Sequence, residues 1–90
     1  FIEIINQSKY IDCHHSDIGL YAFPKINCEN ISADEIANML LQEKGIACVP
    51  GSAFGELSVD HLRFSMNQPK NLLIDIANKI VSTLNKVCSS

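Results

Sequence analysis

One arginine stands out among the residues of this sequence that could carry out chemistry. Arg63 is the single arginine of the chain, and it lies in the run His61–Ser65, a few residues after a segment that contains two glycines, 50–56. A guanidinium stays charged at ordinary pH and can bind both oxygens of a carboxylate at once. The pattern therefore suggests a carboxylate-binding site, although an arginine on a strand more often forms a surface ion pair, here with Glu35 or Glu56.

The other candidate groups give weaker signals. Cys13, His14 and His15, with His61, have no H-x-x-x-H or C-x-x-C spacing, and neighbouring residues of a strand point to opposite faces. We therefore expect no metal site. Ser52 lacks the glycine spacing of a nucleophile elbow, and the six lysines fall in polar turns, on helix surfaces or at the ends of elements. We expect no catalytic residue in this chain.

The composition is that of a small globular domain without a basic surface. The chain has 90 residues, of which 47% are hydrophobic, and a net charge of −3 with a pI near 5.4. Nucleic-acid binding thus has no electrostatic support, and no apolar run reaches the roughly 20 residues of a membrane span. Because the chain begins with Phe1 rather than methionine, inside an apolar segment, we interpret it as a piece of a longer polypeptide.

Four cysteines bear on the compartment in which the protein works. Cys13, Cys28, Cys48 and Cys88 have wide and irregular spacing, and each lies in or beside an apolar segment. A small secreted disulfide scaffold usually has a denser and more regular framework. We therefore expect buried, reduced thiols in a cytoplasmic protein.

Two helices are predicted from clear local signals. Ser32 and Glu35 have the spacing of a capping box, and Gly45 occupies a C-cap position, so a helix is expected over 33–44. Pro69 suits the first turn of a helix, and apolar residues then recur every three or four positions, which predicts a long amphipathic helix over 70–87. Residues 1–6 are too short to classify and could be the last turns of another helix.

Shorter apolar runs predict strands. They occupy residues 10–13, 19–26, 46–49 and 62–66, with a polar turn at 14–17 and a loop at 51–60. Because side chains alternate along a strand, Arg63 should face away from the side that carries Leu62 and Phe64. The predicted fold class is α+β, a two-layer sandwich in which a small, mostly antiparallel sheet has two main helices on one face, and residues 1–90 form a single domain.

Three segments carry a resemblance to a known family. They are DIGLYAFPKI at 17–26, LLQEKGIACVPGSAFG at 40–55 and HLRFS at 61–65. In order and spacing they resemble the C-terminal, smaller domain of the class I/II aminotransferases, pyridoxal-phosphate enzymes of the aspartate aminotransferase type (fold type I). One departure is Ile18, where family members commonly have glycine.

The resemblance implies a role for several residues. Arg63 would bind the α-carboxylate of amino-acid and 2-oxo-acid substrates, and Ser52, Ala53 and Phe54 would line the entrance of the active site. The strand around 21–23 would lie near the same cleft. The pyridoxal phosphate would be held by a large domain that this chain lacks, so the chain alone should be inactive. The resemblance also implies that the parent enzyme is a cytoplasmic homodimer.

Two other functions are left open by the residues themselves. A stand-alone module that binds amino acids or another small molecule is compatible with a single 90-residue α+β domain. A purely structural or dimer-forming domain is compatible with the long apolar helix over 70–87. The three segments do not indicate which amino acid is the amino donor. A related lyase or synthase on the same fold would show the same segments.

Overall fold

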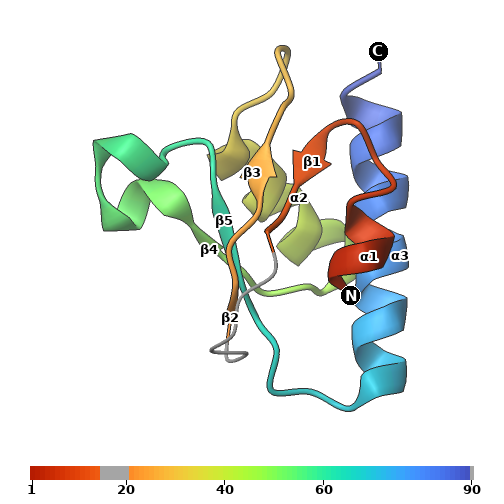
Figure 1. The fold of residues 1–90 in the computed structure, drawn as a ribbon. Coiled ribbons are helices and arrows are strands. Elements are labelled where there is room, and N and C mark those ends of the chain that lie inside the picture. Colours follow the sequence, from red (N-terminus) through yellow and green to blue (C-terminus); the bar gives the residue numbers. More distant parts are fainter. Residues whose placement is uncertain (15–20, 90) are drawn as a thin grey trace.

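The elements of the chain alternate between helices and very short strands. The computed structural model describes residues 1–14 and 21–89 (Figure 1). The elements in chain order are α1 (Ile2–Ile5), β1 (Ile11–Asp12), β2 (Tyr21–Ala22), β3 (Lys25–Ile26), α2 (Ala33–Lys44), β4 (Val49–Pro50), the 3-10 turns η1 (Gly51–Phe54) and η2 (Glu56–Ser58), β5 (Leu62–Ser65) and α3 (Lys70–Val87).

The strands pair only in antiparallel fashion. β5 lies between β2 and β4, and β1 pairs with β3. A bridge between Lys25 and His61 connects the two sets of strands. In register, Ala22 lies opposite Phe64, and Val49 lies opposite Arg63. β5 is thus the central strand, and it places residues 62–65 between two neighbours.

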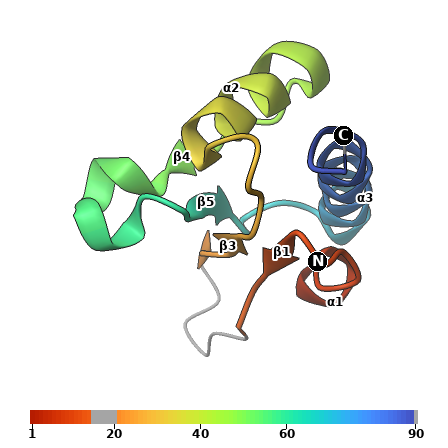
Figure 2. The ribbon, with the colours of Figure 1, turned by 90° about the horizontal axis from the view of Figure 1, so that it is seen from above.

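The two long helices begin and end as their sequences predict. The Ser32 side chain accepts a hydrogen bond of 3.2 Å from the backbone N–H of Glu35, which satisfies one of the free donors at the start of α2. Gly45 has φ 67°, a left-handed conformation that favours glycine, and it ends the helix. α3 follows Pro69 directly and runs beside α1, as both views show (Figures 1 and 2).

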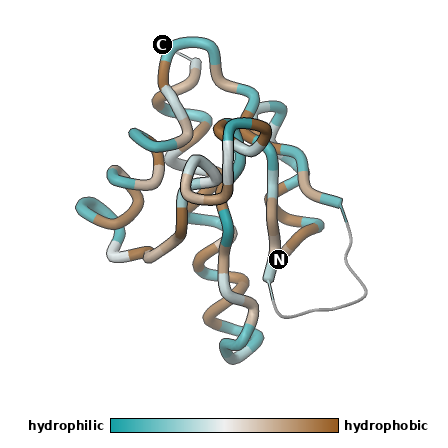
Figure 3. The backbone as a smooth tube through the Cα atoms, turned by 90° about the vertical axis from the view of Figure 1, so that its left-hand side faces the viewer, coloured by the Kyte–Doolittle hydropathy of each residue, from teal (hydrophilic) through white to brown (hydrophobic). Residues whose placement is uncertain are grey.

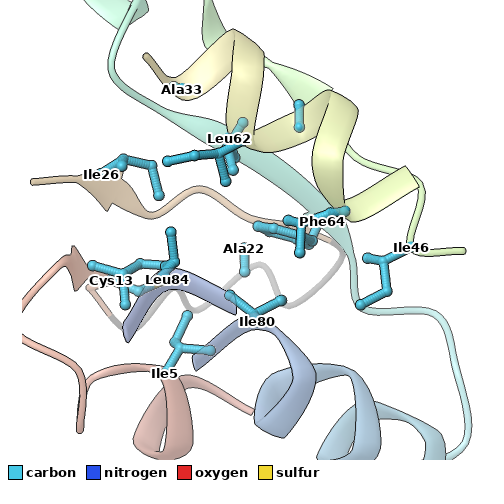
Figure 4. Close-up of a cluster of buried hydrophobic side chains, with 14 of the residues drawn as sticks. Ile5, Cys13, Ala22, Ile26, Ala33, Ile46, Leu62, Phe64, Ile80 and Leu84 are labelled. Carbon is cyan, nitrogen blue, oxygen red and sulfur yellow. The ribbon is translucent and has the colours of Figure 1, made fainter. Parts of the chain in front are cut away.

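One hydrophobic core joins the helices to the strands. Hydrophobic and hydrophilic residues alternate along the helical turns (Figure 3). Ile5, Ile80 and Leu84 of the helices lie against Ala22 and the β5 side chains in the close-up (Figure 4). Ile36 and Leu40 of α2 belong to the same buried cluster, so both long helices contribute to one core. The predicted α+β class is confirmed, and none of the helices in the described residues is long and apolar enough to cross a membrane.

The predicted strand over 19–26 differs from the structure. The described part contains two strands, β2 and β3, interrupted at Phe23 and Pro24, while residues 19 and 20 lie outside the described residues. Pro24 has no N–H to donate, but its carbonyl accepts a hydrogen bond of 3.1 Å from Leu62 N–H. The chain then changes partner from β5 to β1, so a single run of apolar residues serves two sheets.

The region around β4 also differs from the prediction. The strand is limited to Val49–Pro50, and Pro50 belongs to it instead of stopping it. Because β4 is an edge strand, a proline without a donor costs no ladder hydrogen bond on its outer side. The predicted loop over 51–60 contains η1 and η2. The predicted polar turn at 14–17 lies outside the described residues from position 15 on.

The expectation of reduced cysteines was wrong for two of the four. Cys28 and Cys88 form a disulfide with a Cα–Cα distance of 5.5 Å, which is within the usual range. The bond joins the segment that leads into α2 to the end of α3. Cys13 is buried and Cys48 half-buried, and both are free thiols. Spacing along the chain did not reveal the pair because its members are 60 residues apart.

Cys48 should react slowly with alkylating reagents. Burial raises the pKa of its thiol from an ordinary value of 9.0 to about 11, because desolvation disfavours the thiolate. In the folded protein, the alkylation rate should rise about tenfold per pH unit from pH 7 to 10 and level off only near pH 11. Mass spectrometry of the Cys48 peptide measures this rate, with the unfolded chain as control. A plateau near pH 9 in the folded protein would contradict the prediction.

Candidate functional site

Arg63 lies on the face of β5 that points away from the core. Leu62 and Phe64 are 0% and 2% exposed, whereas Arg63 between them is half-buried. The predicted alternation is thus confirmed. Since β5 is paired on both sides, its backbone is fixed by β2 and β4, and the base of the Arg63 side chain is held with it. A central strand is a rigid support for a binding residue.

Two aromatic rings flank the Arg63 guanidinium. Its Cζ atom lies 4.4 Å from the ring centroid of Tyr21 on β2 and 4.9 Å from that of Phe54 in η1. Each cation–π contact at a partly exposed site stabilises the arrangement by about 0.5–1 kcal/mol. An aromatic face offers no strong hydrogen-bond acceptor, so these contacts do not consume the N–H donors of the guanidinium. Tyr21 and Phe54 are each 49% exposed, which leaves the site open to solvent.

No carboxylate neutralises Arg63 within the described part of the chain. The ion pairs there join Lys25 to Asp60 and Lys79 to Asp75, and His61 Nδ1 lies 2.9 Å from the Asp60 carboxylate. Neither of the glutamates considered as surface partners forms a bond with Arg63 among the described residues. A half-buried cation without a carboxylate partner is well suited to bind an external anion.

Further aromatic groups extend the surface beside Arg63. The Phe23 ring stacks on the His61 imidazole with centroids 4.7 Å apart, and it meets the Phe54 ring edge to face at 6.0 Å. We call Tyr21, Phe23, Phe54 and His61 the aromatic rim. The resemblance placed residues 21–23 near the cleft; in the structure Tyr21 contacts Arg63 and Phe23 contacts Phe54, whereas Ala22 is buried in the core. The contribution of His61 was not predicted, although His61 directly precedes β5 and lies two positions from Arg63 along the chain.

Ser52 and Phe54 occupy the same turn but have different neighbours. The Ser52 hydroxyl donates a hydrogen bond of 2.9 Å to the Asp34 carboxylate in the first turn of α2. Phe54, two residues later, reaches Arg63. The loop that carries both is closed by a hydrogen bond of 2.7 Å from Gly51 N–H to the His61 carbonyl. The sequence expectation grouped Ser52 with Phe54 at an entrance, and the structure places its hydroxyl on α2.

A Cβ atom at Gly51 would not fit in this loop. It would overlap the backbone oxygen of Ser58 and lie 2.8 Å from that of His61. Glycine is therefore required at this position by close packing of backbone against backbone. The tight closure fixes where η1 begins relative to β5, and hence where Phe54 stands relative to Arg63.

The described residues do not form a site for pyridoxal phosphate. All six lysines are exposed, whereas an amine that forms a Schiff base usually lies in a desolvated environment. No group of three or more histidine, cysteine, aspartate or glutamate side chains in the described residues could hold a metal ion.

These features define an α+β domain that holds a half-buried arginine between two aromatic rings. The family model "Aminotransferase class I and II" matches residues 1–80. The chain therefore belongs to the class I and II aminotransferase family.

Several known proteins are similar to the chain over most of its length. The LL-diaminopimelate aminotransferase of Aquifex aeolicus is 31% identical over 70 residues, which are 78% of this chain and 18% of that protein. The aspartate aminotransferase of Pyrococcus horikoshii is 31% identical over 66 residues, 73% of this chain and 17% of that protein. The structure of an alanine aminotransferase from Pyrococcus furiosus superposes with a TM-score of 0.86 at 22% identity, over 94% of this chain and 22% of that one.

The likeness to that solved structure shows that the two share a fold. The chain spans less than a quarter of the length of each of these relatives.

Proposed function

We propose that this chain is the C-terminal, smaller domain of a pyridoxal-phosphate-dependent aminotransferase, and that Arg63 binds the α-carboxylate of its amino-acid and 2-oxo-acid substrates. The observation that carries the proposal is the Arg63 guanidinium between Tyr21 and Phe54, without a carboxylate partner among the described residues. Membership of the aminotransferase family supports it, because amino acids and 2-oxo acids share an α-carboxylate.

The geometry supports a binding and orienting role for Arg63. Two parallel N–H···O bonds from one guanidinium fix both the position and the plane of a carboxylate. A substrate held in this way has its Cα in a defined place relative to groups that act on it, which is how binding lowers the barrier of a reaction. Phe54 belongs to the proposed site because it contacts Arg63, and Ser52 belongs to it through the turn that carries Phe54.

The other half of the proposed site lies outside this chain. Arg63, Tyr21 and Phe54 are partly exposed on an open face, whereas small-molecule sites usually bury most of their ligand. Pyridoxal phosphate, bound by a larger domain of the same polypeptide, would supply the electron sink that amino transfer requires. We further infer that the parent is a homodimer in the cytoplasm. The location rests on the family alone, and the Cys28–Cys88 disulfide, of a kind rare in the cytosol, speaks against it.

Amino transfer by the longer polypeptide tests the proposal. The full-length protein, loaded with pyridoxal phosphate, is incubated with single amino acids and 2-oxoglutarate, and the glutamate formed is measured. We expect transfer from at least one amino acid by the full-length protein and none by the 90-residue chain. Release of carbon dioxide without transfer would instead indicate a decarboxylase. Tight, saturable binding of an amino acid to the 90-residue chain, measured by calorimetry, would favour a stand-alone binding module.

A further inference from the structure

The hydrogen bond between Ser52 and Asp34 joins the turn η1 to the start of α2. Ser52 lies in η1 and Asp34 in the first turn of α2, 18 residues earlier. Of the side-chain hydrogen bonds in the described part of the chain, this is the one that connects η1 to α2. Both side chains are exposed, so the bond adds little to the core. Its effect must lie in where it holds the turn.

η1 is constrained at two points, and both determine the position of the Phe54 side chain. The first is the bond from Gly51 N–H to the His61 carbonyl, which fixes the start of the turn against β5. The second is the Ser52 hydroxyl on Asp34, which prevents the turn from rotating about that start. Phe54 is the last residue of η1, and its ring contacts Arg63 on one side and Phe23 on another. A turn released from α2 could carry the ring away from the guanidinium.

We propose that the Ser52–Asp34 hydrogen bond positions Phe54 over Arg63, so that the guanidinium is ordered before a carboxylate arrives. The inference rests on the proposed function, in which Arg63 binds the substrate. An arginine side chain loses rotamer freedom when it binds a ligand, and ordering it in advance increases affinity. In this account Ser52 and Asp34 are positioning residues, since they act on the substrate through Phe54 and Arg63 and touch neither the carboxylate nor the guanidinium themselves.

Kinetics of the full-length enzyme with amino-acid substrates test the proposal. Ser52→Ala should raise KM about three- to tenfold, the effect of losing the net contribution of one ordinary hydrogen bond, while kcat changes less than twofold. Asp34→Ala should do the same. Asp34→Asn should stay close to wild type, because its amide oxygen still accepts the hydroxyl proton. Ser58→Ala, the same change in the same loop at a hydroxyl without a hydrogen-bond partner in the described residues, is the matched control. Thermal melting shows that each variant is folded.

A Phe54→Ala background separates positioning from direct contact. If Ser52 acts through Phe54, Ser52→Ala should not raise KM further in that background. An unchanged KM in Ser52→Ala, or the same rise with and without Phe54, would overturn the positioning role. Arg63→Lys distinguishes the two proposals. If it raises KM and Ser52→Ala does not, only the positioning role fails. If Arg63→Lys leaves KM at the wild-type value, the proposed function fails as well.

Discussion

Replacement of Arg63 with lysine in the full-length enzyme is expected to lower kcat/KM for amino-acid substrates about a hundredfold, mainly through a higher KM. Lysine keeps the charge but offers a single ammonium group, so the two-point contact with the carboxylate is lost. The loss of a charge-assisted, bidentate contact corresponds to about 3 kcal/mol of transition-state stabilisation. The substitution would also remove the planar guanidinium, whose Cζ atom lies 4.4 Å from the Tyr21 ring centroid and 4.9 Å from the Phe54 ring centroid.

Two controls make this result specific to the carboxylate. The first control is Lys79→Arg, the reverse exchange of lysine for arginine, on α3, where Lys79 pairs with Asp75. The kinetics of this variant should match those of the wild type. An amine without a carboxylate should react equally slowly with the wild type and with Arg63→Lys. Wild-type kinetics of Arg63→Lys with amino acids would remove Arg63 from the substrate site.

Loss of the Cys28–Cys88 disulfide is expected to lower the free energy of unfolding of the chain by about 4 kcal/mol. A cross-link between residues 60 positions apart restricts the unfolded chain over a long loop, and loop-closure entropy gives this magnitude. The loss is a large fraction of the stability of a domain of 90 residues. Urea unfolding of the oxidised protein and of the Cys28→Ser/Cys88→Ser double variant measures it.

The free thiols provide the comparison for this experiment. Cys48 is half-buried and unpaired, so Cys48→Ser should cost much less than the double variant. The hydrogen bond of 2.7 Å from Asn30 to the Val87 carbonyl joins the same two segments, and it should keep the end of α3 near the start of α2 in the native state. Equal urea midpoints for the oxidised protein and the double variant would show that the disulfide contributes no stability.

The sequence predicted the long helices well because their limits depend on local signals. Ser32 marks the start of α2 and Gly45 marks its end, and Pro69 marks the start of α3. The strands were predicted less well, since strands of two to four residues are defined by partners elsewhere in the sequence. The change of partner at Pro24 and the inclusion of Pro50 in β4 depend on which strand lies at an edge, which no local pattern shows.

The candidate site was predictable in part. Alternation along β5 correctly predicted the face on which Arg63 lies, and the resemblance to the aminotransferases supplied its expected ligand. The stacking of Tyr21 and Phe54 on the guanidinium depends on how β2 and η1 come together in space. The same is true of the bond from Ser52 to Asp34, whose partners are separated by most of α2 and by β4. Such contacts require the tertiary structure.

The closure of the loop at Gly51 and His61 has a consequence for protein engineering. The two ends of the loop are held together by backbone contacts between Gly51 and His61. A change of side chain at the tip of the loop should therefore not displace β5. Leu57 in η2 is 97% exposed and contributes almost nothing to the core. A fluorescent reporter attached to the side chain at position 57 should therefore be tolerated, and it would lie three residues along the chain from Phe54 of the proposed site, where it could report the arrival of a substrate.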